Sequence, residues 1–212
     1  MRMLRFGIPL FMCLLFVSEA SGEVLSNTPT GDDIAAFGRP DTQTYGQVFT
    51  APVTGSLDSF TLHLNGFAGD IRGAVGSWNG TPSHDFGFGE TSTLYLSSPV
   101  TTSAAPSAYT FNPNVNVVAG DVYVAYLTVF GLSGPDAVTT MPLGTSPAGI
   151  NYFVWNNTTS PFGNPSWDYF FDVGSVLFSA SFTPVPEPSS LGFVTLIVGR
   201  VGCRRTRFSR NR

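Results

Sequence analysis

The chain has 212 residues, a formal net charge of −4 and only 11% charged residues, and it contains arginine but no lysine. Eight of the ten arginines lie near the two ends, so residues 23–186 carry two arginines against twelve acidic residues. An acidic interior of this kind repels phosphate backbones, which argues against nucleic-acid binding. Both cysteines, Cys13 and Cys203, lie in the terminal segments, so the interior has no disulfide framework.

The first twenty residues have the three parts of a secretory signal peptide. Arg2 and Arg5 form a positive start, Phe6–Val17 is a continuous apolar run, and Ser18 and Ala20 are small residues placed for cleavage after Ala20. The apolar run is shorter than a helix that spans a bilayer. We therefore expect residues 1–20 to be removed when the secretion translocon exports the chain.

Residues 23–183 show a period of two rather than the 3.6-residue period of a helix. Phe60, Leu62 and Leu64 alternate with polar residues, and so do Val176, Phe178, Ala180 and Phe182. This pattern, broken by Gly, Pro, Asn and Asp, predicts an all-β domain, specifically a single jelly-roll-like antiparallel β-sandwich. Asp121–Phe130 is apolar on both faces and is expected to be a central strand, with other strands at Gln47–Thr50, Asp70–Trp78, Thr93–Ser97, Ala108–Phe111 and Asn151–Trp155.

Turn residues separate these strands. Asn79-Gly80 is typical of a tight turn, and Ala119-Gly120-Asp121 is expected to form another. Gly131–Gly149 has the weakest pattern in the interior and is expected to be a surface excursion with at most a short strand.

Residues 184–212 combine three features in a fixed order. The proline-rich segment Val185, Pro186, Glu187, Pro188, Ser189, Ser190 is stiff and extended, because each proline fixes its own φ and restrains its predecessor. The apolar run Leu191–Gly199 predicts a short hydrophobic helix. Positive residues then stop membrane passage, at Arg200, Arg204, Arg205 and Arg207.

This order resembles the PEP-CTERM sorting signal of bacterial exported proteins, with Pro186, Glu187 and Pro188 at the signature positions. The resemblance implies a precursor held transiently in the inner membrane and cleaved by exosortase. It also implies delivery to the cell surface or to an extracellular polysaccharide matrix. Arg200 departs from the pattern, because it interrupts the apolar run after nine residues. The interior is also similar to the uncharacterised β-sandwich domains that such proteins often carry.

Catalytic motifs are not evident, and no enzymatic activity is expected. His63 is predicted on the polar face of a strand, and His84 with Asp85 lies in a Gly- and Pro-rich loop. Two carboxylates across a cleft would suit a glycosidase, and Asp168 with Asp172, or Glu90 with Asp85, are the pairs that the sequence offers. We expect all twelve interior acids to be solvated charges.

Sugar binding is a better-supported chemistry, because aromatic rings stack on sugar faces while Asn and Asp supply oriented hydrogen bonds. The candidate residues are Trp78 beside Asn79, Trp155, and Trp167 beside Asp168. No cofactor is expected. Asp32-Asp33 or Asp168 offers the oxygen ligands that calcium prefers, but no spaced calcium-binding loop is present.

The sequence therefore predicts a secreted structural or adhesive module of the cell surface or matrix. Two alternatives stay open, a lectin-like carbohydrate-binding module and a secreted hydrolase. Buried tryptophans would favour the structural module, whereas two exposed aromatic side chains in a groove would favour the lectin. A histidine within hydrogen-bond reach of a serine and an acid would favour the hydrolase.

Overall fold

Antiparallel β-strands form the folded part of the chain, and the described residues contain no helix. The computed structural model describes residues 21–80, 88–157, 160–169 and 174–185, which lie in the compact unit Ser21–Val185. The predicted all-β class is therefore confirmed. No helix of sufficient length and hydrophobicity to cross a membrane occurs in those residues.

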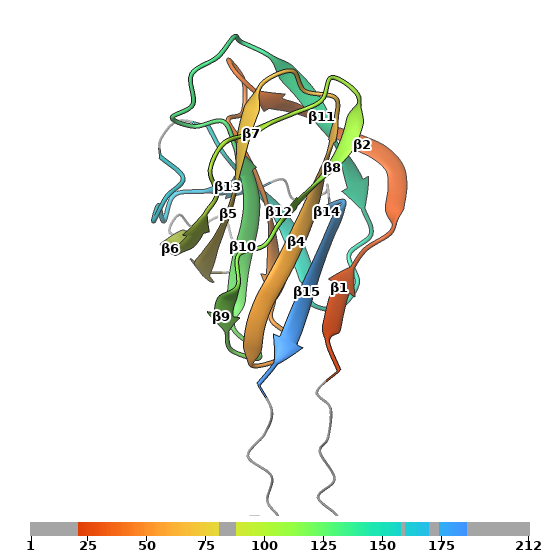
Figure 1. The fold of residues 1–212 in the computed structure, drawn as a ribbon, viewed down its shortest axis with the longest axis vertical. Helices are drawn as coiled ribbons and strands as arrows, with labels where there is room; N and C mark the ends of the chain where they lie inside the picture. The colour runs from red at the N-terminus through yellow and green to blue at the C-terminus, as the bar shows by residue number, and fades with distance from the viewer. Residues whose placement is uncertain (1–20, 81–87, 158–159, 170–173, 186–212) are drawn as a thin grey trace, which may run out of the picture. The chain divides into compact units, whose positions relative to one another are not determined.

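Two large sheets pack face to face (Figure 1). The five-stranded sheet has the order β1-β15-β4-β8, with β9 also paired to β4. Its strands are β1 (Glu23–Ser26), β15 (Phe178–Pro184), β4 (Gly55–Asn65), β8 (Pro106–Phe111) and β9 (Val115–Val117).

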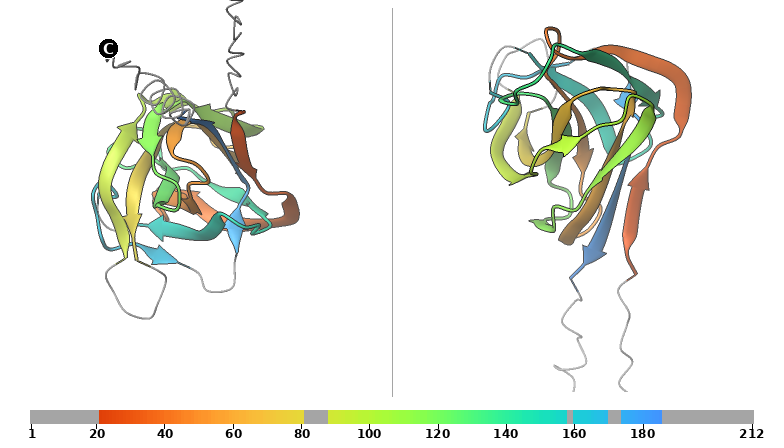
Figure 2. Two further views of the ribbon diagram at one scale, coloured as in Figure 1. Left: turned by 90° about the horizontal axis from the view of Figure 1, so that it is seen from below. Right: turned by 45° about the horizontal axis from the view of Figure 1, so that its top comes forward.

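The seven-stranded sheet forms the second layer and has the order β13-β12-β3-β10-β5-β6, with β7 also paired to β5. Its strands are β13 (Asp168–Tyr169), β12 (Ile150–Asn156), β3 (Thr44–Thr50), β10 (Val122–Thr128), β5 (Asp70–Asn79), β6 (Gly89–Leu96) and β7 (Val100–Thr101). A small third sheet with the order β14-β11-β2 flanks the two layers (Figure 2). It consists of β14 (Ser175–Val176), β11 (Val138–Gly144) and β2 (Pro29–Gly38).

The strand pairs of the two large sheets are nested along the chain. β5 pairs with β6, β4 with β8, β3 with β10, and β1 with β15, all antiparallel. Along the sequence, the two strands of each pair lie on either side of the pair named before it. Because the pairs alternate between the two sheets, the fold depends on contacts between residues far apart in the chain.

The main core lies between the two large sheets and consists mostly of aromatic side chains. Phe49 of β3 stacks on Phe178 of β15 with ring centroids 5.5 Å apart, which joins one sheet to the other. Phe60 of β4 stacks on Phe111 of β8 at 5.2 Å. Stacked aromatic pairs add stabilisation beyond the area that they bury. The alternation of Phe60, Leu62 and Leu64 therefore correctly predicts the inward face of β4.

A second apolar cluster covers the opposite, outward face of the seven-stranded sheet. Val124 and Tyr126 of β10 belong to it, while Tyr123 and Ala125 face the main core. β10 is thus buried on both faces and lies between β3 and β5, which confirms the predicted central strand. The other strands predicted from the alternating pattern are also present, within β3, β5, β6, β8 and β12.

One local prediction is confirmed only in part, and another is wrong. The segment Gly131–Gly149 contains β11, a seven-residue strand with a fully buried Met141 that pairs with both β2 and β14. Pro142 and the register shifts on either side of it interrupt the alternation of buried and exposed residues, so the strand cannot be recognised from the sequence pattern. Asn79-Gly80 does not make a two-residue turn, because Asn79 pairs with Gly89 and nine residues connect them.

Candidate functional site

The candidate site is a hollow at the end of the seven-stranded sheet, where β5 and β10 separate. The last pair between these two strands is Ser77 with Tyr123. Beyond it, β5 continues in pairing with β6, and β10 begins in pairing with β3. The diverging strand ends leave a hollow of about 440 Å³, lined by Ser77, Trp78, Asn79, Gly80, Gly120, Asp121, Val122 and Tyr123.

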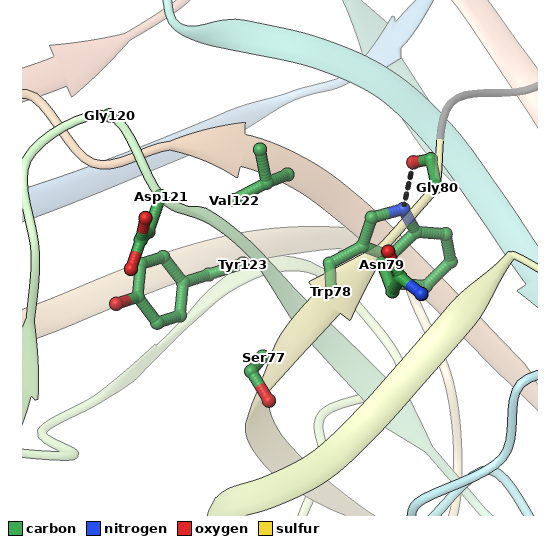
Figure 3. Close-up of a pocket in the computed structure, with 8 residues that line it drawn as sticks. All are labelled: Ser77, Trp78, Asn79, Gly80, Gly120, Asp121, Val122 and Tyr123. Carbon is green, nitrogen blue, oxygen red and sulfur yellow. Dashed lines mark hydrogen bonds between the residues drawn. The ribbon is translucent and has the colours of Figure 1, made fainter.

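Polar side chains and the aromatic rings of Trp78 and Tyr123 surround this hollow (Figure 3). Asn79 and Trp78 come from the end of β5, whereas Asp121 directly precedes β10 and Tyr123 lies near its start. Asn79 and Asp121 are exposed, and neither side chain makes a hydrogen bond to another described residue. No contact with another described residue therefore has to be broken for these two groups to bind a ligand from solvent.

The other side chains of the wall are fixed by contacts inside the protein. The Trp78 indole donates from Nε1 to the Tyr152 hydroxyl at 2.8 Å and to the Gly80 carbonyl at 3.1 Å. The Tyr123 hydroxyl accepts a hydrogen bond from the Val118 backbone N–H at 3.0 Å. A wall held in this way presents a pre-formed surface to a ligand.

An aromatic cap covers the outward face of the seven-stranded sheet beside this hollow. We use this name for Phe88, Phe162, Trp167 and Tyr169, which pack on Trp78, Tyr126 and Tyr152 of the sheet. The Trp78 and Trp167 rings meet edge to face with centroids 5.7 Å apart. The outward face of the sheet is thereby converted into a second, smaller core.

A buried carboxylate lies beneath the aromatic cap. Glu90 of β6 is fully buried; its Oε1 accepts from the Tyr126 hydroxyl at 3.2 Å and its Oε2 from the Gly163 N–H at 2.6 Å. Burial raises the pKa of Glu90, while these hydrogen bonds oppose the increase. The expectation that every interior acid is solvated is therefore wrong for Glu90, because the cap removes this position from water.

The structure brings together only two of the three candidate tryptophans. Trp78 and Trp167 are buried in the second cluster, whereas Trp155 is half-buried against the main core on the other face of the same sheet. Asp168 is exposed and lies opposite Trp155 in the β12–β13 register. These residues do not share one surface, and only Trp78 lines the hollow.

The residues considered for catalysis do not converge in the described part of the chain. His63 is half-buried on the outer side of β4, where burial lowers the pKa of its imidazole. It makes no hydrogen bond to a described serine or acid. His84, Asp85 and Asp172 lie outside the described residues, so the pairs Glu90–Asp85 and Asp168–Asp172 are not placed.

The oxygen ligands considered for calcium are also separate. Asp32 and Asp33 are exposed on β2, and Asp33 accepts a hydrogen bond from Thr140 at 3.3 Å. Over residues 21–80, 88–157, 160–169 and 174–185, no three His, Cys, Asp or Glu side chains are grouped to hold a metal ion.

The predicted sorting segment lies almost wholly outside the described residues. Val185 is the last of these, and its N–H donates to the Thr54 carbonyl at 3.0 Å. The remaining motif residues, Pro186, Glu187, Pro188, Ser189 and Ser190, are not placed, and neither are Arg200, Arg204, Arg205 and Arg207.

Asp121 and Tyr123 are lining residues that the sequence does not single out for a site. The pattern predicts Asp121 only as part of a turn, and the turn is confirmed by the positive φ of Gly120 and by the hydrogen bond from the Asp121 N–H to Val118. The one feature of the sequence that could have indicated Asp121 as a site residue is its position in a turn directly before a strand. The pairing of β10 with β5, which places Asp121 and Asn79 in the lining of one hollow, is not visible in local sequence.

Comparisons of the chain with known protein families, curated proteins and solved structures gave no significant match. Proposals about its function therefore depend on the sequence features and on the geometry described above.

Proposed function

We propose that the chain is an exported structural or adhesive protein of the cell surface or extracellular matrix, processed at its C-terminus by exosortase. The observation that carries this proposal is the antiparallel pairing of the first and last strands, with Glu23 opposite Phe182. The folded unit begins and ends at adjacent positions of one sheet. Both predicted processing segments precede or follow it in the sequence, so each can be removed without loss of a strand.

The position of the last strand also supports this proposal. β15 ends at Pro184, and Val185 makes a final hydrogen bond to Thr54 directly before the proline-rich motif. A protease that reads Pro186-Glu187-Pro188 would therefore act next to the fold rather than within it. The inner membrane would hold the precursor only until this cleavage.

The fold that we propose is a jelly roll. Four nested antiparallel pairs, β5–β6, β4–β8, β3–β10 and β1–β15, alternate between two packed sheets, which is the arrangement expected of a rolled hairpin. In this interpretation the additions to the eight-stranded plan are β2, β7, β9, β11, β12, β13 and β14. The burial of Trp78 and Trp167, with Trp155 half-buried, supports a structural module rather than one that exposes its tryptophans.

The test of routing is to replace Pro186, Glu187 and Pro188 by alanine in the full chain. We expect the wild-type protein to be recovered from the cell surface or medium without residues 1–20 and without the arginine-rich end. The variant should remain in the membrane fraction with Arg204 and Arg205 still present by mass spectrometry.

A matched control replaces Pro135 and Asp136 by alanine, since these are also a proline and an acid and lie exposed in the connection before β11. This control should be processed as the wild type is. Recovery of surface protein with its arginine-rich end intact would refute the proposal.

A second candidate function, a lectin-like carbohydrate-binding module, is favoured by one observation. The hollow between β5 and β10 presents two polar side chains, Asn79 and Asp121, that have no hydrogen-bond partner in the described part of the chain and line the same hollow as the fixed Trp78 ring. Such a module would attach the protein to polysaccharide without covalent chemistry.

A further inference from the structure

We propose that the hollow between β5 and β10 binds a sugar residue of a neutral polysaccharide, with Asp121 and Asn79 as the hydrogen-bonding residues. This inference rests on the proposed function, because sugar binding in the hollow would be the contact by which a surface or matrix protein adheres. The hollow volume of about 440 Å³ is at the low end of the range for small-molecule sites, which is roughly 300–1,000 Å³. It suits one or two sugar residues rather than a long chain.

The polar groups of the hollow match the chemistry of sugar hydroxyls. The Asp121 carboxylate only accepts hydrogen bonds, so it can take two O–H groups, whereas the Asn79 amide both donates and accepts. The Tyr123 hydroxyl accepts from Val118 and keeps its own proton available to donate. Because Asp121 and Asn79 are exposed and make no hydrogen bond to described residues, a ligand does not have to break existing contacts.

One side of the hollow is apolar and rigid. The Trp78 ring is 7% exposed, and its N–H is already bonded to Tyr152 and Gly80. Trp78 therefore offers only carbon atoms to a ligand, together with the half-buried Val122. Sugars present C–H groups that pack against such a surface while their hydroxyls turn to the polar side.

Glycine forms the backbone at both rims of the hollow. Gly80 has φ +91° and Gly120 has φ +85°, a region that other residues rarely adopt. A Cβ atom built on Gly120 meets no atom within 4 Å, so this rim faces open space. Because the rims carry no side chains at these two positions, a ligand can approach the backbone closely.

The charge of the hollow selects a neutral glycan over an acidic one. Among the described residues that line the hollow, Asp121 is the one carboxylate, and none is an arginine or a histidine. Of the two arginines in the folded unit, Arg39 donates to the carbonyls of Leu132 and Gly134, at a different loop. A uronic acid would place its carboxylate near Asp121 with no compensating cation, which is unfavourable.

The experiment is a calorimetric titration of the full chain, purified in detergent, at neutral pH. The probes are cellotetraose, mannotetraose, galactotetraose and tetragalacturonate. We expect at least one neutral tetrasaccharide to bind and tetragalacturonate not to bind. Asp121→Asn should weaken that binding by roughly tenfold or more, as expected for loss of a hydrogen bond to a charged group, and Asn79→Ala by roughly fivefold, as expected for a neutral group.

The matched control is Asp136→Asn, which removes an exposed aspartate that does not line the hollow, and it should bind as the wild type does. Near-ultraviolet circular dichroism of the packed aromatic side chains checks that each variant is folded. Three outcomes would overturn the inference: no binding of any neutral probe, unchanged binding in both variants, or preference for tetragalacturonate. Asp121→Asn should still be exported and trimmed, so failure of binding and failure of routing are distinguishable.

Discussion

The carboxylate of Glu90 accepts a hydrogen bond from the backbone N–H of Gly163 at 2.6 Å, and this contact joins the edge of the seven-stranded sheet to the segment that covers it. Glu90 is fully buried, and no ion pair forms within the described residues. A buried carboxylate without a cation is costly when ionised, because hydrogen bonds only partly replace water. Protonation of Glu90 is therefore expected to change the stability of the fold beneath the aromatic cap.

Replacing Glu90 by glutamine should change how stability depends on pH. Burial raises the pKa of Glu90 in the folded protein, whereas the unfolded chain titrates near the ordinary value of about 4.3. Between these two values the folded state binds more protons, so the free energy of unfolding falls as pH rises. The contribution of Glu90 is largest below about pH 4.3 and is lost as pH rises through the folded value.

Urea denaturation over a pH series measures this effect. The stability of the wild type relative to Glu90→Gln should be highest in acid and should decline to a plateau, because all other titrating groups are shared by the two proteins. A difference that stays constant, or that grows as pH rises, would contradict the assignment.

Gly76 of β5 should not tolerate alanine, because Glu90 occupies the space above it. A Cβ atom on Gly76 would lie 2.1 Å from Glu90 Oε1 and 2.4 Å from its Cγ. Overpacking of this kind typically costs about 1–3 kcal/mol. In a Glu90→Ala background the cost should be smaller, with a coupling energy of about 1 kcal/mol in a double-mutant cycle measured by denaturation. Additive effects of the two substitutions would show that Glu90 does not cause the restriction.

Asn27 should be a major determinant of stability although it is only half-buried. Its Nδ2 donates to the carbonyls of Thr145 and Val176 at 2.9 and 2.8 Å, and its Oδ1 accepts from the Phe178 N–H at 2.8 Å. These bonds join the segment between β1 and β2 to the third sheet and to β15. Asn27→Ala should destabilise the protein by about 2–4 kcal/mol, since a buried group left unpaired costs about 1–3 kcal/mol.

Asn27→Asp provides the matched comparison, because aspartate keeps the acceptor and loses both donors. Its thermal unfolding midpoint should fall below that of the wild type but stay above that of Asn27→Ala at neutral pH. Equal stability of all three proteins would mean that water replaces these bonds at no cost.

The sequence predicts those strands whose local pattern matches their burial. In β4, Phe60 and Leu62 point inward and Thr61 points outward, so alternation alone locates the strand. β2 shows no such pattern, because residues 29–33 are all exposed and only Phe37 and Gly38 at its end are buried. It is a strand because it pairs with β11, and pairing between distant segments leaves no local signal.

The candidate site is predictable only in part for the same reason. Trp78 and Asn79 stand out as an aromatic residue beside an amide, but Asp121 resembles any turn aspartate until β10 is placed beside β5. The burial of Glu90 likewise depends on the absence of a side chain at Gly76 and on a covering segment about seventy residues later. Both are properties of the assembled fold rather than of local sequence.

Tyr152→Phe should weaken the wall of the hollow without unfolding the protein. The Tyr152 hydroxyl accepts from Trp78 Nε1 at 2.8 Å and donates to the Gly80 carbonyl at 3.0 Å. Because the Trp78 N–H also contacts Gly80 directly at 3.1 Å, it keeps a partner in the variant. The cost should therefore be about 1 kcal/mol, the value of an ordinary hydrogen bond. Tyr95→Phe is the control, since no hydrogen bond to the Tyr95 hydroxyl occurs among the described residues, and it should change stability by less than about 0.5 kcal/mol.

The pH dependence of this difference identifies the hydroxyl as its source. Burial raises the pKa of Tyr152 to about 12, whereas an unfolded tyrosine titrates near 10. The stabilisation by the protonated hydroxyl is complete below about pH 10 and is lost as pH rises towards about 12, because only the unfolded chain then releases the proton. The stability advantage of the wild type over Tyr152→Phe should shrink over this interval in urea titrations. A constant advantage would contradict this assignment, because it would mean that the pKa of the hydroxyl is the same in the folded and unfolded states.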